Sequence, residues 1–126
     1  MIVGLGLDLC PVERGAQMLE KERFLERVFT PVEREYLAAR GALAAQSAAG
    51  LYAAKEAVLK ALGTGIGPKG TALLQVEVTH GAYGAPQVHL TGAALSRLPS
   101  LGGARVHLTI THDGGMAAAA AIAEGE

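Results

Sequence analysis

The sequence predicts an α+β fold, because of the order in which its candidate elements occur. An apolar strand-like segment opens the chain, helical segments follow as far as residue 62, and segments of strict apolar–polar alternation fill much of the second half. The regular strand–helix–strand alternation of parallel-sheet proteins is missing. We therefore expect helices and antiparallel strands in separate parts of the chain.

The first 40 residues predict one short strand and several helices. Residues 2–9 are apolar, glycine-spaced and β-prone, and Pro11 then removes a ladder N–H group. Residues 11–27 mix apolar with charged side chains, as a surface helix or two short ones would. Thr30-Pro31-Val32-Glu33 has the pattern of a capping box with proline at the first helical position, which predicts a helix to about Arg40.

Residues 47–62 are the strongest helix candidate. They are dense in Ala, Leu, Lys and Glu, contain no proline, and end at Gly63, a natural residue after a helix end. One stripe of this helix carries Leu51, the stem of Lys55, Val58 and Leu62. A second stripe, with a spacing of four residues, carries Tyr52, Glu56 and Lys60.

The second half predicts two pairs of antiparallel strands. Residues 74–79 and 88–90 alternate on either side of a turn that contains Gly and Pro, and residues 92–98 predict a short helix before Pro99. Residues 106–111 alternate again, and His112-Asp113-Gly114-Gly115 forms a turn. Residues 116–123 then predict a strand by position, although alanine favours helix, so we expect a hairpin.

Length and composition favour one compact domain over residues 1–126. Of these residues 50% are hydrophobic and 18% charged, which suits a packed interior. Only 4% are aromatic, so small side chains must fill much of the core, and each buries little surface. A small domain of this kind gains from burying further surface between subunits, which favours oligomerisation.

The charge balance and the single cysteine exclude several classes of protein. A net charge of −1 gives no general attraction to nucleic acid or to anionic lipid. Cys10 is alone, which excludes an intrachain disulfide and fits a reducing compartment. The start lacks the basic region of a signal peptide, and no apolar run approaches the ~20 residues of a membrane span. We expect a cytoplasmic protein that binds neither nucleic acid nor membrane.

Asp8, Glu56 and Lys60 are the candidates for chemistry. Asp8 lies in an apolar stretch, where a carboxylate needs a cation, donors or solvent; capping a loop is an equally good explanation. If Asp8 and Glu56 meet, two carboxylates suit Mg²⁺, which completes its octahedron with water and substrate phosphate. Lys60 would add positive charge against that phosphate.

The local sequence also allows a purely structural reading of two of these residues. Glu56 and Lys60 have the spacing and order of a routine helical ion pair worth about 0.2–0.5 kcal/mol, which is the better explanation of the pair taken alone. Gly63-Thr64-Gly65, however, follows with little side-chain bulk, so that a ligand could approach the backbone closely.

Several other sites are weaker or excluded. Gly4-Leu5-Gly6 lacks the third glycine of a dinucleotide fingerprint, and residues 65–71 lack the lysine of a phosphate loop. The spacing of the histidines, without cysteine partners, argues against zinc, and we expect His80, His89 and His107 at the surface or an interface. His112, after Thr111, either reaches a phosphate or ribose or closes the turn.

The first helical region carries equal numbers of basic and acidic side chains, which is typical of a solvated helix. A basic stripe forms only if the helix separates the two signs. Arg14 and Arg27 are the best candidates for contacting an acidic partner.

Four segments of the chain together resemble the small bacterial holo-acyl-carrier-protein synthases. These are Gly6-Leu7-Asp8 with Val12 and Arg14, residues 24–33, residues 52–65 and residues 106–113. They cover nearly the whole chain in the right order. The block from Lys55-Glu56-Ala57 to Gly65 is the most specific part.

The resemblance implies a 4′-phosphopantetheinyl transferase-like fold, with an antiparallel sheet packed against a long central helix, and a homotrimer that binds coenzyme A between subunits. It implies Mg²⁺ on Asp8 and Glu56, with Lys60 as the third catalytic residue. A serine of acyl carrier protein would attack the β-phosphate of coenzyme A and release adenosine 3′,5′-bisphosphate. The implied coenzyme A contacts are Lys60, Gly63, Thr64, Gly65, Thr111 and His112, and the carrier protein would meet Arg14 and Arg27.

Two departures and one open role accompany the resemblance. Leu51 stands where the family usually has Arg, and Tyr52 where Phe is usual; Arg40, Lys69 and Arg105 are candidates to replace the lost guanidinium. Leu51 also motivates an alternative, a non-catalytic coenzyme A-binding subunit, and a structural trimer is a third possibility. The base could be Lys60, Glu56 or a metal-bound water.

Overall fold

The computed structural model describes residues 1–126 and confirms the α+β class. Strand β1 (Ile2–Pro11) is followed by three short helices, α1 (Val12–Leu19), α2 (Glu22–Val28) and α3 (Pro31–Ala38), and by the long helix α4 (Ala44–Ala61). The second half contains β2 (Val76–His80), β3 (Pro86–Leu90), α5 (Gly92–Ser100), β4 (Arg105–Asp113) and β5 (Met116–Glu124).

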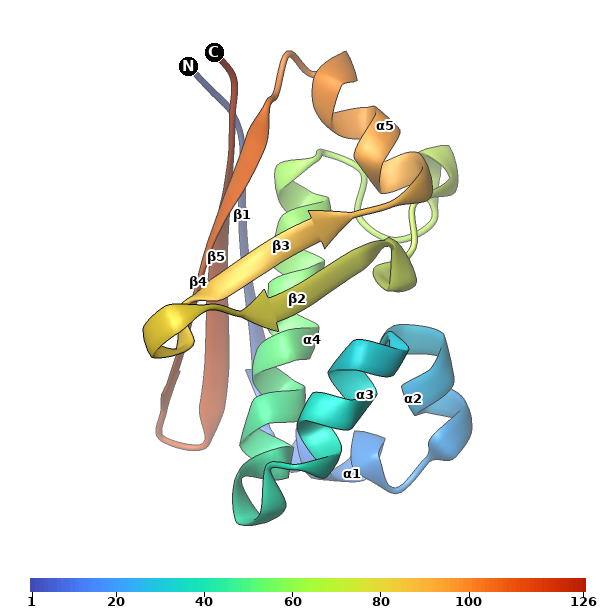
Figure 1. The fold of residues 1–126 in the computed structure, drawn as a ribbon, viewed down its shortest axis with the longest axis vertical. Coiled ribbons are helices and arrows are strands. Elements are labelled where there is room, and N and C mark those ends of the chain that lie inside the picture. Colours follow the sequence, from blue (N-terminus) through green and yellow to red (C-terminus); the bar gives the residue numbers. More distant parts are fainter.

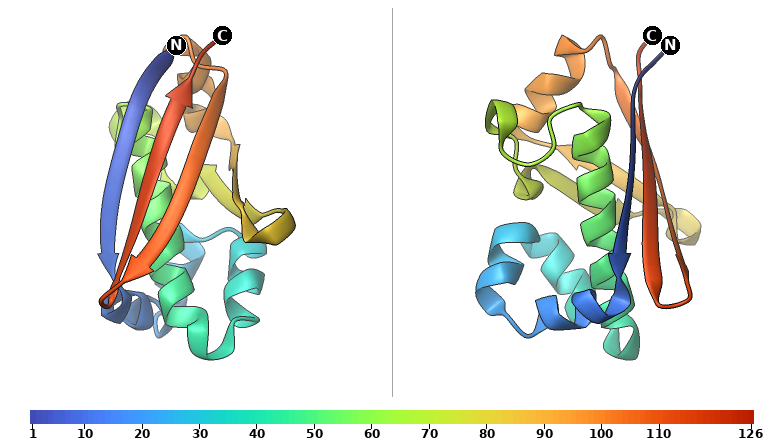
Figure 2. Two further views of the ribbon diagram at one scale, coloured as in Figure 1. Left: turned by 90° about the vertical axis from the view of Figure 1, so that its left-hand side faces the viewer. Right: turned by 180° about the vertical axis from the view of Figure 1, so that it is seen from behind.

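Helix α4 lies at the centre, between two antiparallel sheets (Figure 1). One sheet has three strands in the order β1-β5-β4, and the other is the β2-β3 hairpin. Figure 2 shows α4 against one face of the three-stranded sheet, with the remaining helices and the hairpin beyond α4 and with no element over the opposite face. The two termini lie side by side at one end of the sheet.

Small side chains let α4 lie close against the three-stranded sheet. The buried residues of β5 are all alanines, and most of the buried positions of α4 are Ala or Gly. In β5 the cross-strand pairs with β1 and β4 decide the conformation against the helix preference of alanine. The predicted final hairpin is therefore confirmed.

Local capping signals in the first half were also correct. The Thr30 hydroxyl accepts a hydrogen bond from the Glu33 amide, and the Glu33 carboxylate accepts one from the Thr30 amide, which completes the predicted capping box. Residues 11–27 form two short helices rather than one. None of the helices has the length and apolar character that crossing a bilayer requires.

Three predicted boundaries were wrong. Helix α4 begins at Ala44 rather than Ser47, because the good helix formers Ala44-Ala45-Gln46 continue it from a 3₁₀ turn. Strand β1 continues through Pro11, which an edge strand tolerates because no neighbour needs its N–H. The final turn is only Gly114-Gly115, both at positive φ as a two-residue hairpin requires, and His112 belongs to β4.

Strand β2 also begins later than predicted, at Val76 instead of Leu74. Residues 73–75 form a 3₁₀ turn. The carbonyl groups of Leu73 and Val76 turn toward the ammonium group of Lys55, which accounts for the break in the alternating pattern.

Candidate active site

The site is created by an unusually close approach of β1 to α4. A Cβ atom at Gly6 would lie 1.8 Å from the Ala57 carbonyl oxygen, and one at Gly4 would lie 1.8 Å from that of Ala61. No residue except glycine fits at either position. The inner face of β1 therefore runs directly along the second half of α4, and Asp8 follows Gly6 on that same face.

This approach joins two of the predicted catalytic residues. The Lys60 ammonium nitrogen lies 2.9 Å from the Asp8 carboxylate and also donates to the Leu7 carbonyl oxygen at 3.1 Å. The Lys60 side chain is 48% exposed and that of Asp8 is 16% exposed. Lys60 is thus paired with Asp8 across the helix–strand contact, in place of the helical ion pair with Glu56 that the local spacing suggested.

Glu56 contributes a second negative charge to the same place. The hydrogen bond from Lys60 to Asp8 is the main cause that raises the pKa of Lys60, and the charge of Glu56 adds to the effect. While it is paired with Asp8, Lys60 therefore stays protonated at neutral pH. The charges of Asp8, Glu56 and Lys60 therefore act on one another and form one cluster.

Tyr52 and Arg14 extend this cluster toward α1 and α2. Burial raises the pKa of Tyr52, and the nearby Glu56 charge raises it further. The Arg14 guanidinium lies 5.3 Å from the centre of the Tyr52 ring, and the Phe24 ring lies 6.2 Å from it. Sequence reasoning had assigned Arg14 only to a partner surface, and it missed this contact with Tyr52.

Cys10 is fully buried and is affected by the charges of the same cluster. Burial is the main cause that raises the pKa of its thiol, and the carboxylates of Asp8 and Glu56 raise it further. A neutral, buried thiol is an inert packing group.

The donor set fits magnesium better than zinc. No group of three or more His, Cys, Asp or Glu side chains is placed to hold a metal ion. Two carboxylates would leave most of an octahedron to water and to a ligand phosphate, which is how Mg²⁺ is usually held. A structural zinc site would instead need four protein ligands.

The glycine-rich segment leaves the end of α4 beside this cluster. Gly63 and Gly65 have positive φ values, and the amides of Thr64 and Gly65 both donate to the Leu59 carbonyl oxygen. The Thr71 hydroxyl holds the segment by donating to the Gly65 carbonyl oxygen at 2.7 Å. The Arg97 side chain of α5 donates to the Leu62 carbonyl oxygen, a contact that no pattern in the sequence indicated.

Thr111 and His112, the remaining predicted coenzyme A contacts, lie far from the Lys60–Gly65 region. The ring of His112 covers Gly50, where an added Cβ would meet His112 Nε2 at 3.0 Å. Gly50 and Gly63 are about 20 Å apart along α4 at 1.5 Å per residue. Thr111 pairs with Ala118 and so points from the opposite, uncovered face of the sheet. Within one chain, Thr111 and His112 do not join the Lys60–Gly65 region.

His112 borders a hollow that also contains the family departure at Leu51. Its lining includes Tyr36, Arg40, Ser47 and His80. The Tyr36 and His80 rings are stacked at 4.3 Å, and Arg40 lies 5.3 Å from the centre of the Tyr36 ring while donating to the Ser47 hydroxyl. His80 is therefore half-buried here, whereas His89 and His107 are exposed as expected.

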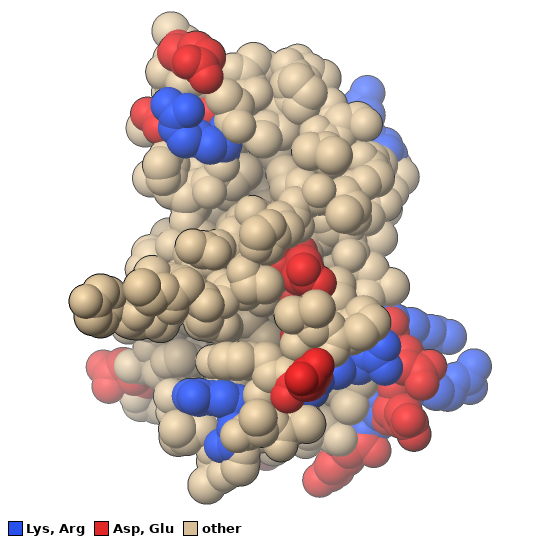
Figure 3. Space-filling view, in the orientation of Figure 1, with Lys and Arg blue, Asp and Glu red and all other residues tan.

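The predicted partner residues Arg14 and Arg27 are both exposed, on α1 and α2. Figure 3 shows basic and acidic side chains intermingled over this part of the molecule. The helices therefore do not form a purely basic stripe. Two neighbouring hollows, one at Arg14 and one at Arg27, share Lys21 and Phe24 in their linings.

Comparison with known proteins gives a consistent result. Residues 4–120 match the family model of the 4′-phosphopantetheinyl transferase superfamily. The chain is 51% identical to the holo-[acyl-carrier-protein] synthase of Anaeromyxobacter dehalogenans strain 2CP-1, over 99% of this chain and 98% of that protein. It is 43% identical to the synthase of Treponema denticola, over 99% and 100% of the two chains.

Solved structures agree with these relatives. The crystal structure of the Neisseria meningitidis holo-[acyl-carrier-protein] synthase superposes with a TM-score of 0.86 at 29% identity, covering 98% of this chain and 99% of that one. The Bacillus anthracis synthase, in complex with CoA (3′,5′-ADP), gives a TM-score of 0.82 at 35% identity, covering 100% and 99%.

The chain therefore belongs to the 4′-phosphopantetheinyl transferase superfamily and is an enzyme of that class. Within the superfamily its relatives place it in the holo-[acyl-carrier-protein] synthase family, which confirms the resemblance seen in the sequence.

Proposed function

We propose that this enzyme transfers 4′-phosphopantetheine from coenzyme A to a serine of an apo acyl carrier protein, with Mg²⁺, and releases adenosine 3′,5′-bisphosphate. The observation that carries the proposal is the convergence of Asp8, Glu56 and Lys60 at the half of α4 that ends in the glycine-rich Gly63–Gly65 segment. The relatives from Helicobacter pylori and Bacillus anthracis, solved in complex with coenzyme A, support the choice of donor.

Asp8 and Glu56 would hold the magnesium ion, because carboxylates are hard oxygen donors and both of these act on the same Lys60 ammonium group. Bound there, Mg²⁺ would neutralise charge that develops on the phosphate oxygens.

Lys60 neutralises charge on the ligand. Its half-exposed ammonium can turn from Asp8 toward a pyrophosphate oxygen. The serine oxygen attacks the β-phosphorus, and the bond from this phosphorus to the oxygen that bridges the two phosphates breaks. That oxygen leaves as part of adenosine 3′,5′-bisphosphate. The candidates for accepting the serine proton are Lys60, the Glu56 carboxylate and a water beside it.

Arg40 is the best of the three candidates to replace the guanidinium missing at Leu51. It lines the same hollow as Leu51 and His112 and forms no ion pair. Lys69 lies in a different hollow, beside α5, and Arg105 is paired with Glu124. We assign the phosphate at the nucleotide end of coenzyme A to Arg40 and His112.

A homotrimer would bring Thr111 and His112 of one subunit close to the Lys60–Gly65 region of the next. The uncovered face of the three-stranded sheet carries a row of exposed leucines, Leu5, Leu7 and Leu9, between 60% and 67% exposed. Fully burying one such side chain contributes about 1.5–3 kcal/mol, so this face favours association with further copies of the chain. Thr111 lies on this same face. One subunit would then supply the Asp8–Glu56–Lys60 cluster and the Gly63–Gly65 segment of each site, and its neighbour would supply Thr111 and His112.

The acyl carrier protein would dock over α1 and α2. Arg14 connects this surface with the cluster through the Tyr52 ring, and Arg27 lies beyond it on α2. An acidic carrier held by these two residues would present its serine near Glu56. The enzyme would meet this partner in the cytoplasm.

The test is the gain of one phosphopantetheine mass by an apo acyl carrier protein, incubated with enzyme, Mg²⁺ and coenzyme A. We expect full conversion by the wild-type enzyme and almost none by Glu56→Ala. Absence of the mass gain with several carrier proteins would contradict the transferase assignment. Coenzyme A binding that is unaffected by Glu56→Ala, without turnover, would support the non-catalytic alternative.

Mixed oligomers test the shared site. Glu56→Ala and His112→Ala chains, unfolded and refolded together, should regain activity that neither has alone, because some interfaces then combine two intact halves. No recovery in verified mixed oligomers would place the whole site within one chain.

A further inference from the structure

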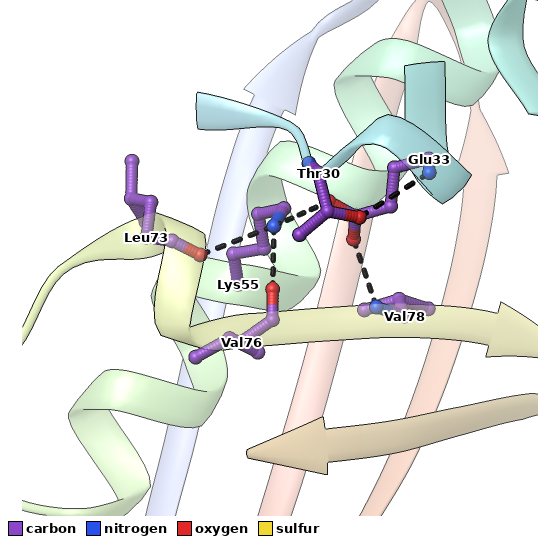
Figure 4. A network of polar contacts seen from close by, with 6 residues as sticks. All are labelled: Thr30, Glu33, Lys55, Leu73, Val76 and Val78. Carbon is purple, nitrogen blue, oxygen red and sulfur yellow. Dashed lines mark hydrogen bonds and ion pairs between the residues drawn. The ribbon is translucent and has the colours of Figure 1, made fainter. Parts of the chain in front are cut away.

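A buried ion pair lies behind the catalytic cluster, on the opposite side of α4 from β1. Lys55 and Glu33 are both 0% exposed, and the Lys55 ammonium lies 2.6 Å from the Glu33 carboxylate (Figure 4). The ammonium also donates to the carbonyl oxygens of Leu73, at 3.1 Å, and of Val76. All three N–H groups of Lys55 therefore have an acceptor.

The carboxylate is equally well satisfied. One Glu33 oxygen accepts from the Thr30 amide at 2.9 Å as well as from Lys55, and the other accepts from the Val78 amide at 2.8 Å. Four parts of the fold meet in this network: the start of α3, the middle of α4, the 3₁₀ turn at residues 73–75 and strand β2.

Stability alone does not account for such a network. A buried ion pair bears a large desolvation cost, and well-packed apolar residues of similar volume often give an equally stable protein. What an ion pair with directed hydrogen bonds adds is a fixed geometry, because the surrounding elements must sit where all of the bonds can form.

The network fixes two parts of the candidate site relative to each other. Lys55 directly precedes Glu56 on a rigid helix, so its position sets the rotation of α4 and the direction of Glu56 and Lys60. The glycine-rich segment leaves α4 at Gly63 and returns at Leu73, where Lys55 holds the carbonyl group. One end of this segment thus continues the helix that carries Lys55, and the other end is held directly by the Lys55 side chain.

We propose that Lys55 and Glu33 are positioning residues, which hold the Glu56–Lys60 face of α4 and the segment from Gly63 to Leu73 in the arrangement that binds coenzyme A. The inference rests on the proposed function, because it takes coenzyme A as the ligand of that segment. Neither side chain reaches the surface, so both act only through the elements that they join.

The test separates positioning from stability. The double variant Glu33→Leu/Lys55→Met replaces the pair by apolar side chains of similar size, and Leu37→Ala weakens the same helix α3 through a fully apolar core residue. At a temperature where circular dichroism shows all proteins folded, we expect the double variant to raise the KM for coenzyme A about 10-fold or more. Leu37→Ala should lower Tm and leave that KM unchanged.

Calorimetric titration with coenzyme A gives a second measurement, which does not depend on turnover. A wild-type protein that binds coenzyme A but transfers nothing would sink the proposed function, while a weaker Kd in the double variant would still support positioning. A folded double variant with wild-type KM and Kd would overturn the inference. If the double variant does not fold, Glu33→Gln, which keeps the side-chain volume and one acceptor oxygen, is judged by the same two constants.

Discussion

Helix α4 carries two lysines, five residues apart, in opposite environments. Lys55 is fully buried and surrounded by a carboxylate and two carbonyl groups. Lys60 is half-exposed and meets one carboxylate and one carbonyl group at the surface. The same side chain can thus organise the fold at one position and remain available to a ligand at the other.

The two environments shift the lysine pKa values in opposite directions. Burial lowers the pKa of Lys55, with the Glu33 charge acting against it, while the hydrogen bond to Asp8 raises the pKa of Lys60. A buried charge depends on its partner, whereas an exposed one is also stabilised by water. The comparison therefore makes separate predictions for stability and for activity.

The largest effect on stability is expected from Lys55→Met alone. This change leaves the Glu33 carboxylate buried without its counter-ion, which typically costs about 3–5 kcal/mol. Urea denaturation should show a clearly lower midpoint. A midpoint equal to that of the wild type would contradict the contrast between the two lysines.

Gly6→Ala should have the next largest effect. The new Cβ would clash with the Ala57 carbonyl oxygen, which is backbone and cannot turn away, so β1 must move from α4 at a cost of about 1–3 kcal/mol. Asp8 moves with the strand, so transfer activity should fall as well. Ile2→Ala, at an exposed position of the same strand, is the matched control and should change neither property.

Lys60→Met should reduce activity strongly and stability little, whereas Lys55→Met reduces stability strongly. An exposed ion pair contributes about 0–1 kcal/mol, so the free energy of unfolding should change little. Transfer should nevertheless fall by about 100-fold, because a positive charge at the phosphate is lost. The urea midpoint and the initial rate of transfer measure the two effects. A loss of stability as large as that of Lys55→Met would contradict the conclusion that Lys60 is not needed for folding.

The smallest effect on stability is expected from His80, where burial of a titratable side chain makes stability depend on pH. Burial lowers its pKa from 6.5, and the charge of Arg40 lowers it further. The folded state therefore favours neutral His80, and stability is lost as the pH falls below about 6.5, where the unfolded chain takes up the proton first. His80→Phe, which keeps a ring against Tyr36, should show a smaller drop in Tm between pH 7 and pH 5. An identical drop in both proteins would exclude His80 as a contributor.

Local sequence patterns were sufficient to predict most of the helices and strands. The capping box at Thr30, the helix that ends at Gly63 and the final hairpin all depend on neighbours within a few positions. The types and order of Asp8, Glu56 and Lys60 predict a phosphate site, and the family comparison confirms the resemblance that points to the same residues.

The tertiary structure alone decided which charges meet. Lys60 pairs with Asp8, 52 residues away, and not with Glu56 one turn earlier on the same helix. Glu33 holds the Val78 amide across 45 residues, and Lys55 holds the Leu73 carbonyl group in a 3₁₀ turn that takes residues 74 and 75 out of the predicted strand. Helical and strand periodicities report which face a residue occupies, but the partner on that face depends on how closely two distant backbones approach. Here that approach is set by Gly4 and Gly6 on one side of α4 and by the buried Lys55–Glu33 pair on the other.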